Sequence, residues 1–127
     1  MTRLRVVAAL AAVVIAAGFG LAVRQTKDYD AAAAATNAHQ YARAARLLDR
    51  AGRLNPDATV DLARARVAIS EGDQGSTRRI LLDVVRREPE NAAAWGAIAY
   101  DFIQSDPALS KRGLQAFYRL NPKKPQP

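Results

Sequence analysis

The stretch Arg53-Leu54-Asn55-Pro56 recurs as Arg119-Leu120-Asn121-Pro122, and Arg87-Glu88-Pro89 lies midway between the two copies. The three prolines are therefore 33 residues apart. A residue before proline disfavours the α region, so a helix is expected to end there, whereas proline itself is tolerated in the first turn of the next helix. A fixed period of this length is typical of stacked helical repeats. The sequence therefore predicts three helical hairpins, over residues of about 25–56, 57–89 and 90–122.

Each repeat reads as two helices joined by a turn. Apolar residues recur at helical spacing between the stops, and Glu71-Gly72-Asp73 breaks the pattern in the second unit. Asn55, Asp57 and Asn91 offer side-chain acceptors to the first backbone N–H groups of the helices that follow. We expect His39 to be a turn residue and Pro107 to begin a helix. The expected helices cover residues 25–37, 41–54, 58–70, 77–87, 92–104 and 107–120.

Over residues 25–122 the pattern resembles the tetratricopeptide repeat (TPR) family. The first-helix positions of the family are matched by Trp95, Ile98, Ala99 and Phe102, and its second-helix positions by Ala44, Leu48, Ala51 and Pro56. The first unit departs most from the family pattern. The resemblance implies an all-α fold in which about three hairpins form a short right-handed α-solenoid. It also implies that the large aromatic side chains pack in the core, namely Tyr41, Trp95, Phe102 and Phe117.

The resemblance further implies a concave surface built from the first helix of each hairpin, where family members bind extended peptides or partner helices. Small and apolar groups predominate at these positions, so an apolar segment or helix is the expected partner. The Lys and Asn residues with which some members clamp a peptide carboxylate are absent. The expected groove residues are Tyr29, Val60, Ala63, Arg64, Val67, Gly96, Tyr100 and Ile103.

The amino terminus carries an unbroken run of 18 apolar or Gly residues from Val6 to Val23, preceded by Arg3 and Arg5. A helix of this length rises about 27 Å, close to the ~30 Å hydrocarbon core of a bilayer. The run predicts a single-pass transmembrane helix over residues 1–23, with residues 24–127 outside the bacterial inner membrane. A secretory signal cleaved near Gly20-Leu21-Ala22 is the alternative. The residues after the repeats, 123–127, are expected to be a disordered tail.

Basic residues give the chain a net charge of +7, and four of them form a stripe. Arg43, Arg46, Arg50 and Arg53 are spaced by three or four residues, which places them on one helical face. This face could bind an anionic polymer or a lipid surface, whereas Asp49 and Asp57 nearby are consistent with a merely solvated face.

A second exposed surface is expected at the end of the last helix. Leu114 and Tyr118 lie beside its core positions, and no further repeat follows to cover them.

The sequence shows no arrangement of residues that is typical of a catalytic or metal-binding site. The chain has no cysteine and a single histidine, and no nucleophile, base or ligand set lies at a recognisable spacing. The segment with Gly72 and Gly75 lacks the lysine and the spacing of a phosphate-binding loop. We expect these glycines to mark helix boundaries. We expect no enzyme activity, no cofactor and no metal. Nucleic acid is not expected either, because the aromatic residues occupy core positions.

Together these features predict a non-catalytic protein–protein interaction module tethered to a membrane. The helix ends RLNP and REPEN are similar to those of repeat proteins that accompany bacterial polysaccharide polymerases or O-antigen ligases. The expected partner is a protein or peptide, with an envelope or polysaccharide-assembly component as one candidate. A cleaved, secreted TPR adaptor is the alternative, and the sequence leaves the oligomeric state open.

Overall fold

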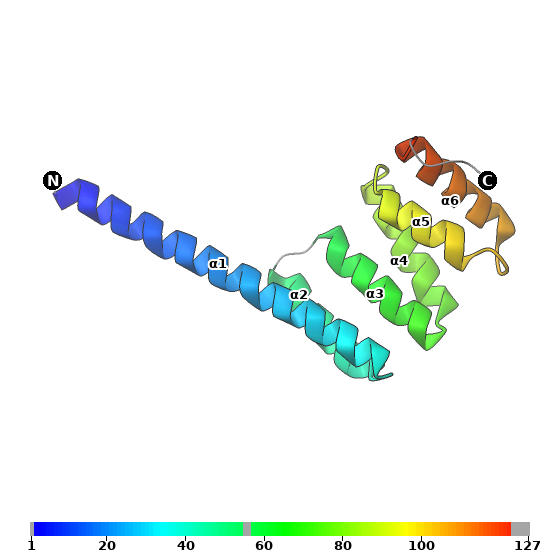
Figure 1. Cartoon of the computed structure of the whole chain (residues 1–127), viewed down its shortest axis with the longest axis horizontal. Helices are drawn as coiled ribbons and strands as arrows, with labels where there is room; N and C mark the ends of the chain where they lie inside the picture. The colour runs from blue at the N-terminus through cyan, green and yellow to red at the C-terminus, as the bar shows by residue number, and fades with distance from the viewer. Residues whose placement is uncertain (1, 55–56, 123–127) are drawn as a thin grey trace. The chain divides into compact units, whose positions relative to one another are not determined.

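The computed structural model describes residues 2–54 and 57–122, and among them the side chains of residues 14–17, 20–53 and 57–122. These residues form six helices, which Figure 1 labels α1 to α6. The predicted all-α fold is confirmed, and its successive helical hairpins have a repeat-like arrangement. The predicted tail at 123–127 and the predicted cap at Asn55 lie outside the described residues. The helices are α1 (Thr2–Asn37), α2 (Tyr41–Leu54), α3 (Ala58–Glu71), α4 (Gln74–Arg87), α5 (Ala92–Asp101) and α6 (Pro107–Leu120).

The chain divides into two compact units, which we call the hairpin unit (Met1–Pro56, with α1 and α2) and the four-helix unit (Asp57–Pro127, with α3 to α6). In the hairpin unit, His39 has a φ of 57° and turns the chain between the two helices. The backbone N–H of Gln40 donates to the carbonyl of Ala35 at 2.8 Å and closes this turn. The prediction of a turn at His39 is therefore confirmed.

Helix α1 runs without a break from Thr2 to Asn37, so the apolar run and the first repeat helix are one element. Within the residues that the structure describes, none of the helices is both long enough and apolar enough to cross a membrane. On this finding, the predicted transmembrane helix over residues 1–23 and the predicted single-pass location in the bacterial inner membrane are wrong.

In the four-helix unit, each helix begins at a side-chain cap, as the Asp and Asn residues at these positions favour. The caps predicted at Asp57 and Asn91 are confirmed, and Pro107 lies in the first turn of α6 as predicted. Gly72 ends α3 with a φ of 80°, a conformation that favours glycine. The capping bonds join Thr59 N to Asp57 Oδ1 (2.8 Å), Ser76 N to Asp73 Oδ1 (2.9 Å), Ala94 N to Asn91 Oδ1 (3.0 Å) and Leu109 N to Asp106 Oδ1 (3.0 Å).

Two helix boundaries of the four-helix unit differ from the expected ones by three residues. Helix α4 begins at Gln74 instead of residue 77, because Asp73 caps it. Helix α5 ends at Asp101 instead of residue 104, and Phe102 turns inward, where only 2% of its surface is exposed. The carbonyl of Phe102 then accepts a hydrogen bond from the backbone N–H of Asp106, which shapes the turn into α6.

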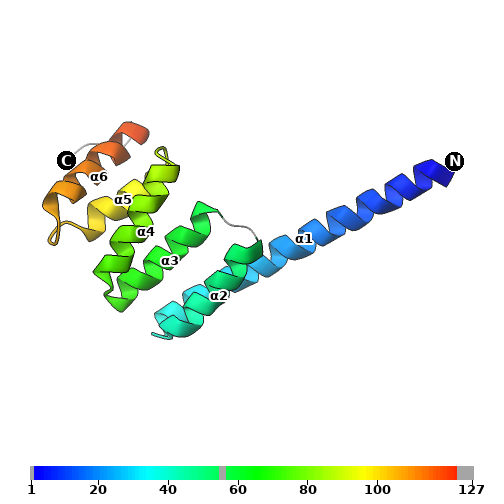
Figure 2. The same cartoon turned by 180° about the vertical axis from the view of Figure 1, so that it is seen from behind.

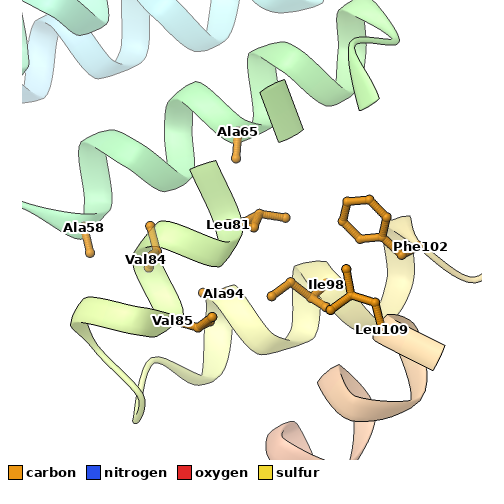
Figure 3. Close-up of a cluster of buried hydrophobic side chains, with 9 residues drawn as sticks. All are labelled: Ala58, Ala65, Leu81, Val84, Val85, Ala94, Ile98, Phe102 and Leu109. Carbon is orange, nitrogen blue, oxygen red and sulfur yellow. The ribbon is translucent and has the colours of Figure 1, made fainter. Parts of the chain in front are cut away.

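The core of the four-helix unit collects side chains from all four helices and from Phe102 (Figure 3). The core position predicted for Phe102 is confirmed, whereas Trp95 is only partly buried against this cluster. The indole Nε1–H of Trp95 donates instead to the carbonyl of Pro89 at 2.8 Å, at the connection between α4 and α5. The buried members are Ala58, Ala65, Leu81, Val84, Val85, Ala94, Ile98, Phe102 and Leu109.

Helices α5 and α6 lie side by side, as Figures 1 and 2 both show. Their closest approach is at Gly113, where an added Cβ would lie 2.7 Å from the backbone N of Ala99 and 2.9 Å from the carbonyl O of Trp95. The hydroxyl of Ser110 donates to the carbonyl of Ala99 at 2.5 Å across the same contact. This tight crossing fixes the orientation of α5, which carries the candidate site.

Candidate functional site

Two large side chains near the end of α5 are strongly exposed. Tyr100 is 78% exposed and Ile103, in the turn after the helix, is 57% exposed. Gly96, one turn before Tyr100 on the same helical face, is half-buried. We call Gly96, Tyr100 and Ile103 the α5 patch. Burial of the intervening Ile98 and Phe102 explains its position, because anchoring those two side chains in the core turns their neighbours outward.

The turn that carries Ile103 is held in place by contacts with α4. A guanidinium N–H of Arg78 donates to Asp106 Oδ2 at 2.6 Å, and the same guanidinium lies 5.9 Å from the centroid of the Phe102 ring. The hydroxyl of Ser105 donates to Gln74 Oε1 at 3.2 Å. These contacts hold the backbone on both sides of Ile103, so the α5 patch is a preformed surface.

The α5 patch contains no charged side chain. Asp101 is the one charged residue of α5, and burial raises the pKa of its carboxyl above the usual value. On α3, the guanidinium of Arg64 pairs with Asp61 at 3.1 Å, so its charge is compensated locally. The chemistry of the patch is therefore that of an aromatic ring, a phenol hydroxyl and an aliphatic side chain.

The structure distributes the other predicted groove residues unevenly. Val60 and Val67 on α3 are buried, with 1% and 8% of their surfaces exposed, and Ala63 and Arg64 are half-buried. Tyr29 is half-buried on α1, in the hairpin unit. Within the four-helix unit, the large apolar groups open to solvent at predicted groove positions are those of Tyr100 and Ile103.

The arginine stripe of α2 contains one arginine that differs from the rest. Arg43, Arg46 and Arg53 are exposed, whereas Arg50 forms a bidentate ion pair with Asp28 of α1. Arg50 Nη2 lies 2.5 Å from Asp28 Oδ1, and its Nε lies 2.9 Å from Oδ2. Hydrogen bonds from Arg50 hold the pKa of the Asp28 carboxyl below its usual value, although burial acts in the opposite direction. No spacing pattern indicates this pair, because its members are 22 residues apart in the sequence.

We expect Arg50→Gln to loosen the hairpin unit, because it leaves the buried carboxylate of Asp28 without its main donor. Amide hydrogen exchange at neutral pH should become faster in α2 and in residues 25–37 of α1. Arg43→Gln is the matched control, since Arg43 lies on the same helix and contacts the exposed Gln40. Equal exchange in the two variants would show that the Asp28–Arg50 pair does not stabilise the hairpin.

Acidification should remove the stabilisation that the Asp28–Arg50 ion pair gives to the hairpin unit. The pKa of Asp28 is lower in the folded hairpin than in the unfolded chain, so acidification protonates the unfolded chain first. The stabilisation is complete above the unfolded value of about 4 and is lost as the pH falls through the lower folded value. Thermal unfolding followed by circular dichroism should therefore separate the wild type from Arg50→Gln at pH 7, and the gap should narrow as the pH falls.

The predicted apolar end of α6 shows intermediate exposure. Leu114 is 37% exposed, and Tyr118 is half-buried with its ring edge-to-face against that of Phe117, the centroids 5.8 Å apart. Leu81 and Val85 lie 33 residues earlier, at the equivalent positions of α4, and both are buried. Helix α6 thus presents more openly the face that α4 uses within the unit.

Among the described residues, no group of three His, Asp or Glu side chains lies where it could hold a metal ion. No protein-family model matches the chain, and no curated protein or solved structure matches it.

Proposed function

We propose that this chain is a non-catalytic interaction module of the TPR type, which binds an apolar peptide segment or helix through the α5 patch. The single observation that carries the proposal is the exposure of Tyr100, near the end of α5, and of Ile103, on the preformed turn that follows. The 33-residue spacing of the helix stops and the capped hairpins α3–α4 and α5–α6 support the TPR assignment. In that class of repeat, the first helix of a hairpin faces the partner, and α5 holds this position here.

The side chains of Tyr100 and Ile103 both still have apolar surface to bury. Burying a side chain of the size of Ile is worth about 1.5–3 kcal/mol, and a Tyr ring adds a large rigid contact with a hydroxyl at its edge. The backbone around Ile103 is already ordered, so binding does not have to order it. Two neighbouring anchors of this kind are enough for a specific, moderate affinity.

The chemistry of the patch sets the chemistry of the partner. A charged group placed against α5 would lose water without gaining an opposite charge, because the one carboxyl of the helix, that of Asp101, is partly buried. An aliphatic or aromatic side chain loses nothing comparable. The partner segment is therefore apolar at the contact and offers a hydrogen-bond acceptor to the Tyr100 hydroxyl.

A random-sequence peptide library selected against the immobilised full chain tests this proposal. The enriched peptides should carry closely spaced apolar residues, and their affinity can be measured by fluorescence anisotropy. Tyr100→Ser combined with Ile103→Ser should weaken binding at least about tenfold, since about 1.4 kcal/mol corresponds to a factor of ten. The loss should appear with unchanged helical content, because both side chains are exposed.

Val14→Ser combined with Ile15→Ser is the matched control, since these α1 side chains are 70% and 71% exposed. The control should keep the affinity within about twofold, as expected for surface changes remote from the contact. Peptides bound equally by both double variants would refute the α5 patch as the binding surface. Enrichment of charged sequences alone would refute the apolar partner.

A further inference from the structure

Both units contain paired and unpaired arginines. In the four-helix unit, four arginines form ion pairs with Asp side chains of the same unit, whereas the exposed Arg66, Arg79 and Arg119 form none with the residues that the structure describes. In the hairpin unit, Arg50 is paired, whereas Arg43, Arg46 and Arg53 form no ion pair with any residue that the structure describes. The pairs in the four-helix unit are Arg64–Asp61, Arg78–Asp106, Arg86–Asp83 and Arg87 with both Asp61 and Asp83.

The net charge of the sequence differs between the two units. Residues 1–56 contain eight Lys and Arg against three Asp, a net charge of +5, whereas residues 57–127 contain eleven Lys and Arg against nine Asp and Glu, a net charge of +2. The two carboxylates nearest to the stripe in the sequence each have an interaction, since Asp57 caps α3 and Asp49 is engaged as well. Helix α2 itself carries four arginines against one aspartate, a net charge of +3.

These arginines form an ordered array along one helix. The buried side of α2 is formed by Ala44, Leu48 and Ala51, and the arginines lie away from it. At a rise of about 1.5 Å per residue, Arg46 lies about 4.5 Å along the axis from Arg43, and Arg53 lies about 10 Å further on. Arg50 between them is fixed by Asp28, and its side chain is still 64% exposed. We call Arg43, Arg46 and Arg53 the α2 arginine face.

We propose that the α2 arginine face binds an acidic helix of a partner protein. A helix lying along α2 has the same rise per residue, so carboxylates three and ten residues apart on it would meet the three guanidinium groups in register. The planar guanidinium donates two parallel hydrogen bonds to a carboxylate, a geometry that lysine does not offer. This surface is separate from the α5 patch and goes beyond the function proposed for it.

Single-stranded nucleic acid fits the face less well than an acidic helix does. Its binding sites combine basic groups with exposed aromatic rings on which bases stack. The described tyrosine rings of the hairpin unit, those of Tyr29 and Tyr41, are half-buried. The hydroxyl of Tyr41 is also within 2.7 Å of His39 Nδ1 in the turn. A regular array of guanidinium groups without a stacking platform favours carboxylates on a helix.

The test uses the full chain and a synthetic alanine-based helical peptide whose glutamates lie at positions i, i+3, i+7 and i+10. A peptide of the same composition with the glutamates distributed around the helix is the second probe. Binding is measured by fluorescence anisotropy at physiological salt, because exposed charges are overestimated at low salt. We expect the patterned peptide to bind at least about threefold more tightly than the redistributed one, in keeping with the modest strength of exposed ion pairs.

The matched variants remove the same charge from different places. The α2 triple variant combines Arg43→Gln, Arg46→Gln and Arg53→Gln, and it should bind the patterned peptide about tenfold more weakly. The control triple variant combines Arg66→Gln, Arg79→Gln and Arg119→Gln, which removes three exposed arginines of the four-helix unit. Its affinity for the patterned peptide should change less than about twofold. Circular dichroism should show the same helical content in both, since all six side chains are exposed.

Three outcomes would overturn the proposal. Equal losses in the two triple variants would show that net charge alone drives binding. Equal affinity for the two peptides would show that binding does not depend on the spacing of the arginines. Tighter binding of a single-stranded oligonucleotide or of phosphatidylglycerol vesicles, lost in the α2 variant, would assign the face to that ligand instead. Tyr100→Ser should leave the acidic peptide bound, which separates this result from that of the α5 patch.

Discussion

Phe102→Ala is expected to lower the free energy of unfolding of the four-helix unit by about 3–5 kcal/mol, the usual cost of truncating a buried Phe. Phe102 is the largest of the fully buried side chains and lies in the core with Ile98 and Leu109 (Figure 3). Its ring also turns the chain at the end of α5, so the cavity would open beneath the turn that carries Ile103. Urea denaturation followed by the fluorescence of Trp95, the single tryptophan of the chain, measures the loss.

Ile103→Ala is the control for this measurement. Ile103 is the next residue, but 57% of its surface is exposed, and we expect a change within about 0.5 kcal/mol. A cost for Ile103→Ala close to that for Phe102→Ala would contradict the assignment of one side chain to the core and the other to the surface. The control also shows that a binding defect at Ile103 is not caused by unfolding.

Gly113→Ala should destabilise the same unit by about 2 kcal/mol, although alanine is the better helix former. The exchange gains about 1 kcal/mol of helix propensity, but the new Cβ would lie within 3 Å of two backbone atoms of α5 and of Ile98 Cγ2. Backbone atoms cannot move aside as a flexible side chain can, so α5 and α6 must separate. Overpacking of this kind typically costs about 1–3 kcal/mol, more where backbone must shift.

Gly75→Ala tests the opposite case in the same unit. An added Cβ at Gly75 meets Asp73 Oδ1 at 3.6 Å, an ordinary contact, in the first turn of α4. We expect an unchanged or slightly higher free energy of unfolding, by up to about 1 kcal/mol. Urea denaturation of both variants gives the comparison. A stabilised Gly113→Ala variant would mean that the two helices are not packed as closely as described.

The local features of the fold could be predicted from the sequence. The cap residues Asp57 and Asn91 and the helix end at Gly72 act on backbone groups within a few residues, so their spacing in the sequence is also their spacing in space. The premature end of α5 could not be predicted, because it depends on Phe102 finding room among core residues from three other helices. The end of α5 is therefore set by tertiary packing and not by the local sequence pattern, which predicted a longer helix.

The surfaces were predictable only in part. Register placed Tyr100 and Ile103 among the groove positions, and the structure leaves both open to solvent. The same register gave Val60 and Val67, which are buried, because equivalent positions in different repeats have different neighbours. The ion pair between Asp28 and Arg50 brings together residues 22 positions apart, and no spacing rule along the chain reports such a distance.

The amino-terminal run shows how a strong sequence signal can mislead. Its length and apolar character led to the prediction of a membrane anchor. Helix α1, however, continues past the run through Arg24, Lys27 and Asp28, and its later turns pack in the hairpin unit. The count of apolar residues did not reveal where the helix would end or what its second half would contact.

The equivalence of α4 and α6 has a consequence for how such a chain can change its length. Because Leu114 and Tyr118 occupy in α6 the places that Leu81 and Val85 occupy in α4, duplication of residues 90–122 would add a hairpin onto a surface already shaped to receive one. Growth in whole multiples of 33 residues would leave every existing contact of the four-helix unit intact, whereas an insertion of any other length would shift the new apolar side chains away from α6.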